Sequence, residues 1–283
     1  MRSDFAHRRR IIPYTITVAI ANLAVTMNGN DFYEAGCGLI KHSGARLMGG
    51  RYRRVNRRKF KAYFGVTPAI CADIWEMVNP QELISVHARP VHLLWGFMLL
   101  KVYATEEVLS GIAGVTEKTF RIWAWKMIRA TADVSYSLIH PGRFKDDIGN
   151  ICKLSVDGTD CPINEPRPFD TAWFTPKFHG PGVRYEVAIN IRTGEICWIN
   201  GPYQCGPWLD GKIFMDGLFK ELVRNEMVQV DKGYRGKPRC WTWYDQPAHD
   251  ERKLASIVRA RHETVNARFK NFKALCIAFR HPR

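Results

Sequence analysis

The sequence lacks the short motifs that mark several large enzyme classes. No Gly-rich phosphate loop, H-E-x-x-H pair or G-x-S-x-G turn occurs, which disfavours the kinase, metalloprotease and hydrolase classes. The cysteines include no C-x-x-C pair, so the spacing of a zinc ribbon or zinc finger is missing. No N-x-Ser/Thr glycosylation acceptor occurs either. We therefore expect reduced, mostly structural cysteines in the cytosol or the nucleus.

Negative charge is scarce relative to positive charge. The 283 residues contain 42 Lys and Arg against 27 Asp and Glu, a formal net charge of +15. Such a surplus suits a polyanion or an anionic membrane surface, and nucleic acid is the commoner partner of a basic globular chain. A basic protein without such a partner has the same composition, so charge alone leaves both interpretations open. Hydrophobic residues make up 46% of the chain, which excludes wholesale disorder.

Residues 1–60 are basic, and we expect them to form a partly irregular N-terminal arm. Arginines at 8–10 precede an apolar run at 11–27, a pattern that a signal peptide shares with a basic arm followed by a helix. Pro13 interrupts the run, which is short for a membrane span, and we favour the arm. A basic cluster at 51–59 suits either a solvated face or phosphate contact and nuclear targeting.

Residues 61–148 show a helical pattern. The stretch from Val91 to Tyr103 is apolar and long enough for a buried helix. Thr105 is expected to cap the next helix, and Thr116 a further helix from Glu117 to Ala132. Helix, short turn and helix is the form of a DNA-reading helix-turn-helix, and a plain helical hairpin shares that form.

The second of these two helices would carry a basic outer face. On a helical wheel, Phe120, Ala124 and Met127 fall on the inner side. Trp125 falls on the outer side, where it could stack on a partner. The residues expected to bind DNA from this face are Lys118, Arg121 and Arg129.

Residues 149–283 change character and predict an α/β layer with a mixed sheet. The order is a strand, a hairpin, a helix, a strand and a long helix. The expected elements, in chain order, are Ile151–Val156, Val183–Ile191, Glu195–Asn200, Asp210–Val223, Met227–Val230 and His249–Leu275.

Two aspartates directly follow expected strands. Asp157 comes before Gly158, and Asp231 comes two residues before Gly233. Glycine at these places suits a sharp exit from a strand and a close approach of the backbone. In an open α/β sheet, sites form beyond the carboxyl ends of the strands. The two aspartates therefore converge if their strands are neighbours.

Glu263 lies on the long helix, away from its apolar stripe, and shares a face with Arg259, Asn266 and Lys270. A surface ion pair and a metal ligand both fit this position. Mg²⁺ prefers oxygen ligands, and two such ions about 3.5–4 Å apart can clamp the attacking and leaving oxygens of a phosphodiester. Three carboxylates on different elements meet that need in a ribonuclease H-like arrangement, although most acids in a chain are simply solvated.

Several strings in this part of the chain match one family in order. They are Leu154–Asp160, Lys177, Tyr185-Glu186, Gly201-Pro202, Asp210, Val230–Tyr234 and Arg261–Lys270. Together they resemble the DDE-superfamily endonucleases related to Harbinger-type transposases. One such motif would be weak, but the ordered set is specific. The resemblance implies a ribonuclease H-like nuclease domain over residues 149–283, with a helix-turn-helix region at 61–148 before it.

The resemblance also implies roles for individual residues. Asp157, Asp231 and Glu263 would be the catalytic acids and metal ligands. Asp210 matches an additional aspartate that is treated as a metal ligand, and an N-cap for the following helix is the alternative. The candidates for phosphate contacts near this site are Lys177, Arg184, Arg259 and Lys270.

The activity that the resemblance implies is cleavage of a DNA strand, followed in a transposase by attack of the new 3′-hydroxyl on target DNA. The cofactor would be Mg²⁺ or Mn²⁺, with two ions in the site. The partner would be DNA in the nucleus, with a separate DNA-binding protein or a second copy of the chain as further candidates and no membrane. The alternative is a domesticated or decayed DNA-binding protein without cleavage activity. Family members continue beyond the position of Phe279, so we expect this chain to lack a C-terminal element.

Overall fold

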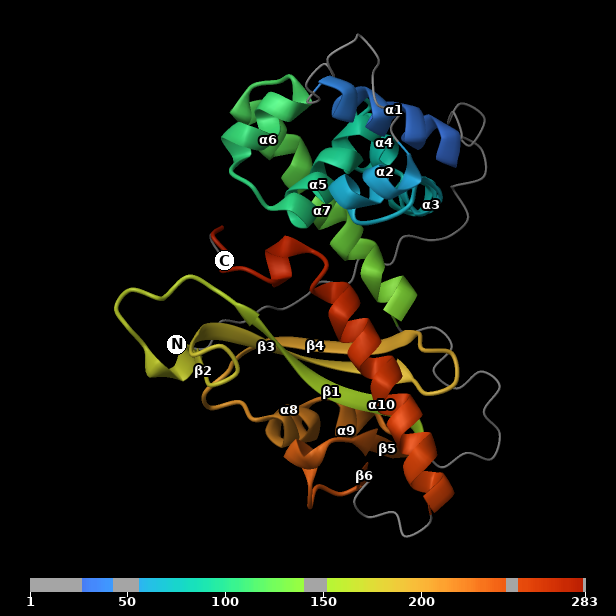
Figure 1. Ribbon diagram of the computed structural model, residues 1–283, viewed down its shortest axis with the longest axis vertical. Coiled ribbons are helices and arrows are strands. Elements are labelled where there is room, and N and C mark those ends of the chain that lie inside the picture. The colour runs from blue at the N-terminus through green and yellow to red at the C-terminus, as the bar shows by residue number, and fades with distance from the viewer. Residues whose placement is uncertain (1–26, 43–55, 140–151, 243–248, 282–283) are drawn as a thin grey trace.

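The computed structural model describes residues 27–42, 56–139, 152–242 and 249–281. Figure 1 shows a helical region above a sheet that is flanked by helices, so the architecture is mixed α/β. No helix within these ranges is both long and apolar enough to cross a membrane. The helical region contains α1 (Gly29–His42), α2 (Arg57–Phe64), α3 (Pro68–Val78), α4 (Pro80–Leu83), α5 (Pro90–Val102), α6 (Glu106–Ala113) and α7 (Glu117–Ile139). The sheet region contains β1 (Cys152–Pro162), β2 (Phe174–Thr175), β3 (Gly180–Asn190), β4 (Ile196–Gln204), α8 (Asp210–Asp216), α9 (Leu218–Glu221), β5 (Met227–Val230), β6 (Cys240–Thr242) and α10 (His249–Phe269).

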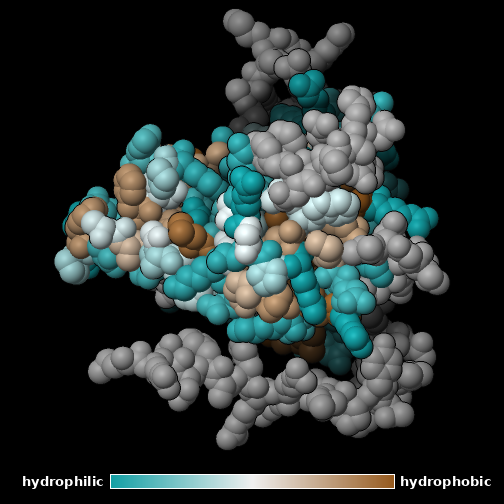
Figure 2. Space-filling view, turned by 90° about the horizontal axis from the view of Figure 1, so that it is seen from below, coloured by the Kyte–Doolittle hydropathy of each residue, from teal (hydrophilic) through white to brown (hydrophobic). Residues whose placement is uncertain are grey.

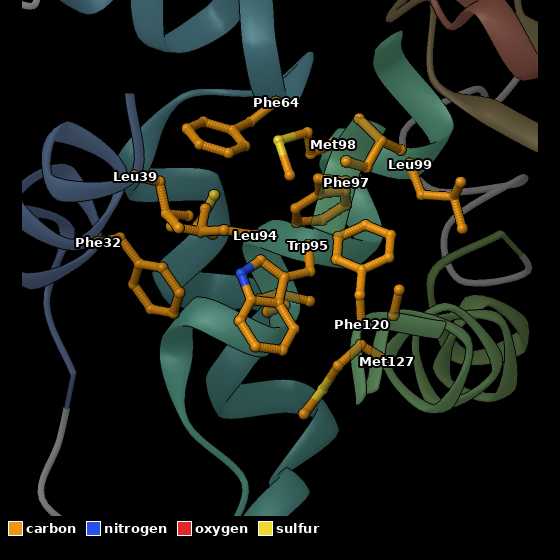
Figure 3. Packing of buried hydrophobic residues seen from close by; sticks show 14 of the residues in the cluster. Phe32, Leu39, Phe64, Leu94, Trp95, Phe97, Met98, Leu99, Phe120 and Met127 are labelled. Atoms are coloured by element: carbon orange, nitrogen blue, oxygen red, sulfur yellow. The ribbon is translucent and has the colours of Figure 1, made fainter. Parts of the chain in front are cut away.

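The helical region encloses a large hydrophobic core, shown in Figure 3. α5 runs through it, and every residue from His92 to Leu99 is buried. A helix that is apolar all round belongs at the centre of a domain, so the buried helix expected at 91–103 is confirmed. Phe120, Ala124 and Met127 of α7 are buried in the same core, as the helical wheel predicts.

Threonine side chains cap two of the helices. Thr105 Oγ1 accepts a hydrogen bond of 3.4 Å from a backbone N–H in the first turn of α6. Thr116 Oγ1 accepts one of 3.3 Å in the same way at α7. Both caps agree with the sequence, because a hydroxyl satisfies a backbone donor that the first turn leaves open. α7 continues to Ile139, beyond its expected end at Ala132.

The expected N-terminal arm is too long, because α1 belongs to the helical core. Phe32 of α1 is fully buried, and its ring meets the Trp75 ring of α3 edge-on, with centroids 6.0 Å apart. α2 begins at Arg57, which is also inside the range assigned to the arm. Residues 1–26 and 43–55 of that arm lie outside the described residues.

One mixed sheet has the strand order β2–β3–β1–β5–β6, and β4 pairs with β3 as well. β3 runs antiparallel to β1 and β4, whereas β5 runs parallel to both β1 and β6. The expected hairpin and the expected strand at Met227–Val230 are therefore confirmed as β3–β4 and β5. The short strands β2 and β6 carry too few residues to show a pattern, and the sequence did not predict them.

β1 continues past its expected end at Val156, because β3 stays paired with it beyond the last residue that pairs with β5. β3 pairs with β1 as far as Pro162 opposite Gly182. β5 pairs with β1 only as far as Val156 opposite Val230. The sheet therefore opens between β1 and β5 after this last pair.

The two faces of the sheet pack against different helices. On one face, Val156 of β1 packs in a cluster with Phe214 of α8. On the other face, Val187 of β3 packs in a cluster with Val265 of α10. Because side chains alternate along a strand, Asp157 faces α10.

Two expected helices are shorter than the sequence predicts. The helix expected at 210–223 is divided into α8 and α9 at Gly217, which has φ −113° and ψ −99°. A Cβ at Gly217 would clash with the Asn200 side chain, so the glycine lets this point of the chain approach β4 closely. α10 ends at Phe269, and a 3₁₀ turn at Lys273–Leu275 replaces its expected last residues.

The chain after α10 ties the helical region to the sheet. Ala274 is buried in the core of the helical region, and Lys101 Nζ of α5 donates to Asn271 O at 2.6 Å. Further along, Phe279 N donates to Pro162 O at 3.0 Å, at the end of β1. This segment therefore helps to fix the sheet against the helices.

Candidate active site

Asp157 and Asp231 lie where β1 and β5 part. Each is the first residue after the last β1–β5 pair, Val156 with Val230. Asp157 lies within β1 rather than beyond its end, because β1 stays paired with β3 while its β5 side is open. The two strands are parallel neighbours, as the convergence of the aspartates requires.

Glu263 lies on the wall that α10 contributes to the same cavity. The cavity has a volume of about 510 Å³ and is lined by Asp157, Asp231 and Glu263 together. Asp157 is half-buried, whereas the other two acids are exposed. The cavity is also lined by Lys177, Arg259, His262, Asn266 and Lys270.

Two hydrogen bonds orient the Asp157 carboxylate. Gly158 N donates to its Oδ1 at 2.8 Å, and Asn266 Nδ2 of α10 donates to its Oδ2 at 3.0 Å. Burial and then the negative charge of Asp231 raise the pKa of Asp157 to about 6, although Lys177 opposes the shift. Carboxylates that repel each other in this way are stabilised by a cation placed near both.

Asp210 lies behind the cavity wall and is not among the residues that line it. Its carboxylate lies against Gly158 and Gly233, where a Cβ would crowd it. Because both glycines lack a side chain, this further carboxylate approaches the aspartate pair closely. Arg184 Nη1 lies 3.4 Å from Asp210 Oδ1 as an ion pair, and burial raises the pKa of Asp210. Leu209 takes the N-cap position of α8, so the N-cap interpretation of Asp210 is wrong.

Arg184 is buried and paired inside the protein, so it is not placed to contact phosphate as the sequence suggested. Its Nε lies 2.7 Å from Asp160 Oδ1, and its Nη2 lies 2.8 Å from Asp160 Oδ2. Thr175 Oγ1 donates to the same carboxylate at 2.7 Å. Burial alone would raise the pKa of Asp160, but these hydrogen bonds lower it. The ion pair between Asp160 and Arg184 therefore joins the side chains of β1 and β3 beside the cavity.

Three side chains fasten α10 to the sheet on either side of Glu263. Arg261 Nη1 donates to two backbone carbonyls in the β3–β4 turn. The buried His262 ring forms a hydrogen bond of 3.1 Å between its Nδ1 and Ser155 Oγ. Burial lowers the pKa of His262 to about 4, so the ring is uncharged at neutral pH. Asn266 provides the third attachment, to β1.

The sequence assigned no role to His262, Asn266 or Glu186, although all three stand in strings that match the family. Glu186 of β3 is 1% exposed, on the face opposite α10. Neither of its carboxylate oxygens has a hydrogen-bond partner within the described ranges. Burial and then Asp210 raise its pKa to about 8. An acid inside an apolar strand was the available signal, because such residues are rarely buried without a partner.

The donor atoms at the cavity suit a hard divalent cation. Asp157, Asp231 and Glu263 offer carboxylate oxygens, which Mg²⁺ and Mn²⁺ accept more readily than sulfur. In the part of the chain that the structure describes, no three acidic, His or Cys side chains are close enough to hold one ion together. The donor chemistry fits such an ion, and side chains would have to move for three of these acids to hold one ion together.

The basic outer face expected on α7 is partly occupied by the protein itself. Arg121 forms ion pairs with two carboxylates, including that of Glu106. Trp125 Nε1 donates to Glu106 Oε1 at 3.4 Å, and its ring packs edge-on against the C-terminal segment, so it is not presented to a partner. Lys118 and Arg129 are exposed. Two of the three cations expected on this face are thus open to a ligand.

Comparison with protein-family models, curated proteins and solved structures found no match to this chain. A function must therefore be argued from the residues and the geometry of the site. That geometry consists of three carboxylates on one cavity, cationic side chains on the same wall, and a helix fastened over them.

Proposed function

We propose that this chain is a metal-dependent DNA endonuclease of the transposase type, as its resemblance to Harbinger-type DDE endonucleases implies. The observation that carries the proposal is the placement of Asp157, Asp231 and Glu263 on one cavity, from three separate elements. The ordered strings of the sequence point to the same three acids independently of the geometry.

The sheet region fits a ribonuclease H-like nuclease domain, and the helical region fits a helix-turn-helix DNA-binding region. In support of the first, β1 has an antiparallel hairpin on one side and parallel strands on the other. In support of the second, a short turn joins α6 to α7, and α7 exposes Lys118 and Arg129.

Asp157, Asp231 and Glu263 would together hold the divalent cations. Bound divalent cations supply Lewis acidity and a water of lowered pKa at the phosphodiester. Gly158 and Asn266 hold the two oxygens of Asp157 in a fixed direction, and each oxygen keeps further lone pairs. With a pKa of about 6, Asp157 is ionised at neutral pH.

Cationic side chains on the cavity wall would hold the DNA backbone. Lys177 Nζ donates to Gly158 O at 3.0 Å, which keeps its charge beside the aspartates. Arg259 of α10 and Lys270, the residue after its last, lie on the same wall. Phosphates bound by these three groups would place a strand across the acids. A transposase would next bind target DNA here, for attack by the new 3′-hydroxyl. Because a transposase acts on chromosomal DNA, we infer that the substrate is DNA in the nucleus.

A plasmid-nicking assay with the full chain tests the proposal. We expect Mg²⁺ or Mn²⁺ to support nicking of supercoiled DNA, and EDTA to stop it. Asp157→Asn should abolish nicking and keep DNA binding, whereas Asp73→Asn, an exposed acid on α3, should act as the native chain does. If native and Asp157→Asn proteins are equally inert but bind DNA with steep salt dependence, the chain is a DNA-binding protein without cleavage activity.

A further inference from the structure

Exposed aromatic rings gather on one part of the surface. Three phenylalanine side chains are exposed, Phe169 at 67%, Phe174 at 44% and Phe178 at 37%. All three belong to residues 163–179, the β1–β3 connection, which projects from the sheet in Figure 1. The projection on the left of Figure 2 carries hydrophobic residues among hydrophilic ones. Such gatherings on a soluble surface mark binding sites.

The β1–β3 connection is anchored beside the cavity. Thr175 is fully buried, and its Oγ1 donates to a buried carboxylate of β1 at 2.7 Å. The Phe178 ring lies over Gly182 of β3, where a Cβ would clash with it. Lys177 Nζ donates to Gly158 O, next to the first aspartate of the site. Phe174 and Phe178, the neighbours of Thr175 and Lys177 in the chain, are therefore held near the acids, and Phe169 belongs to the same connection.

We propose that the β1–β3 connection binds unpaired nucleotides of single-stranded DNA by stacking their bases on Phe169, Phe174 and Phe178. This proposal rests on the proposed function, since it concerns the strand that enters the same cavity. Every base has a π face, so stacking on aromatic side chains is tolerant of sequence. The connection would hold an unpaired strand end at the acids without reading its sequence.

The surrounding charges favour a nucleic acid over a protein as the occupant. Lys177 belongs both to the connection and to the cavity wall, where Arg259 and Lys270 also lie. Phosphates can bind these cations while the bases turn toward the rings. The connection itself has equal numbers of acidic and basic residues, so its own contribution comes from stacking and not from net charge.

Fluorescence anisotropy in EDTA, with a labelled single strand and with a duplex of the same sequence, tests the proposal on the full chain. Phe169→Ala and Phe174→Ala should each weaken single-strand binding at least about fivefold and leave duplex binding unchanged. Phe169→Trp should restore single-strand binding. Leu83→Ala is the matched control, because Leu83 is also 67% exposed but lies on α4.

Two outcomes overturn the proposal. The first is that the Phe variants bind the single strand as tightly as the native chain does, or that they lose affinity for the duplex and the single strand equally. The other is a change in the sedimentation of the Phe variants with unchanged DNA affinity, which would assign the rings to contact with a second copy of the chain. Because EDTA removes cleavage, the result is independent of nicking. If only the nuclease proposal fails, the native chain still binds the single strand, and the Phe variants still lose that binding.

Discussion

Asn266 of α10 donates a hydrogen bond of 3.0 Å to Asp157 of β1, and this bond joins the helix that carries Glu263 to the strand that carries the first aspartate. Glu263 and Asn266 lie one helical turn apart, on the same face of α10. The other amide atom, Asn266 Oδ1, is buried with no hydrogen-bond partner within the described ranges. Through its hydrogen bond, Asn266 is a positioning residue for the Asp157 carboxylate.

Removing this hydrogen bond should weaken metal binding more than it weakens the fold. We expect Asn266→Ala to lower Mn²⁺ affinity and nicking about 10–100-fold, as loss of a group that orients a metal ligand commonly does. Asn266→Asp should also lose the hydrogen bond, because an ionised carboxylate has no proton to donate to Asp157. Calorimetric titration with Mn²⁺ measures the effect. Asn271→Ala, an exposed site just beyond α10, is the control, and an Asn266→Ala protein with native affinity would contradict the role.

The raised pKa of Asp157 predicts a pH dependence for metal binding. Above about pH 6 the carboxylate is ionised, and below it a proton competes with the cation. The rise in Tm on adding Mg²⁺ should therefore be large at pH 7.5 and small at pH 5. Asp157→Asn should show little Mg²⁺ effect at either pH. An equal effect of Mg²⁺ on the native chain at both values would argue against Asp157 as a ligand.

Glu186 should cost stability at neutral pH. The pKa of Glu186 rises from 4.5 to about 8 on folding. Below pH 4.5 the group is protonated in both the folded and the unfolded chain, so the full free energy of unfolding is present. As the pH rises toward 8, the unfolded chain ionises this group more easily, and that free energy falls. We expect Glu186→Gln to exceed the native free energy of unfolding by up to about 4 kcal/mol at pH 7.5, and to match it at pH 4. Urea unfolding at both pH values measures this, with Glu76→Gln on α3 as the exposed control. A gain independent of pH would show that ionisation is not the cause.

The buried ion pair between Asp160 and Arg184 should be sensitive to the loss of one partner. Asp160→Asn leaves the Arg184 charge without its main counter-charge, and we expect a loss of about 3–5 kcal/mol in the free energy of unfolding. Asp216→Asn is the matched control, because Asp216 pairs with Lys220 at 3.8 Å on the surface, where such pairs contribute under about 1 kcal/mol. Denaturant unfolding compares the two variants. Equal losses would mean that burial of the pair does not matter.

Local patterns were sufficient to place the acids near one another. Val230 ends an apolar strand, so Asp231 could be placed at a strand end from the sequence, and β5 has the expected bounds. The helical period put Glu263, Arg259 and Lys270 on one face, and that face lines the cavity. Both inferences depend only on the neighbours of each residue along the chain.

Pairings between distant segments were beyond the sequence pattern. The sequence offers Arg184 as a phosphate contact because nothing along the chain shows that Asp160 lies opposite it across β1 and β3. Arg121 has Glu106 as a partner from the preceding helix, which a wheel of α7 alone does not include. α1 was missed because its burial depends on side chains such as Trp75, far along the chain.

The count of bound Mn²⁺ ions per chain tests the central claim most directly, and electron paramagnetic resonance of free Mn²⁺ measures it. Three acids that share a pair of cations predict about two ions for the native chain, near-complete loss in Asp157→Asn and clear loss in Glu263→Gln. Glu76→Gln should bind as the native chain does. If Glu263→Gln binds the same number of ions with the same affinity as the native chain and Glu76→Gln do, the three acids do not form one metal centre.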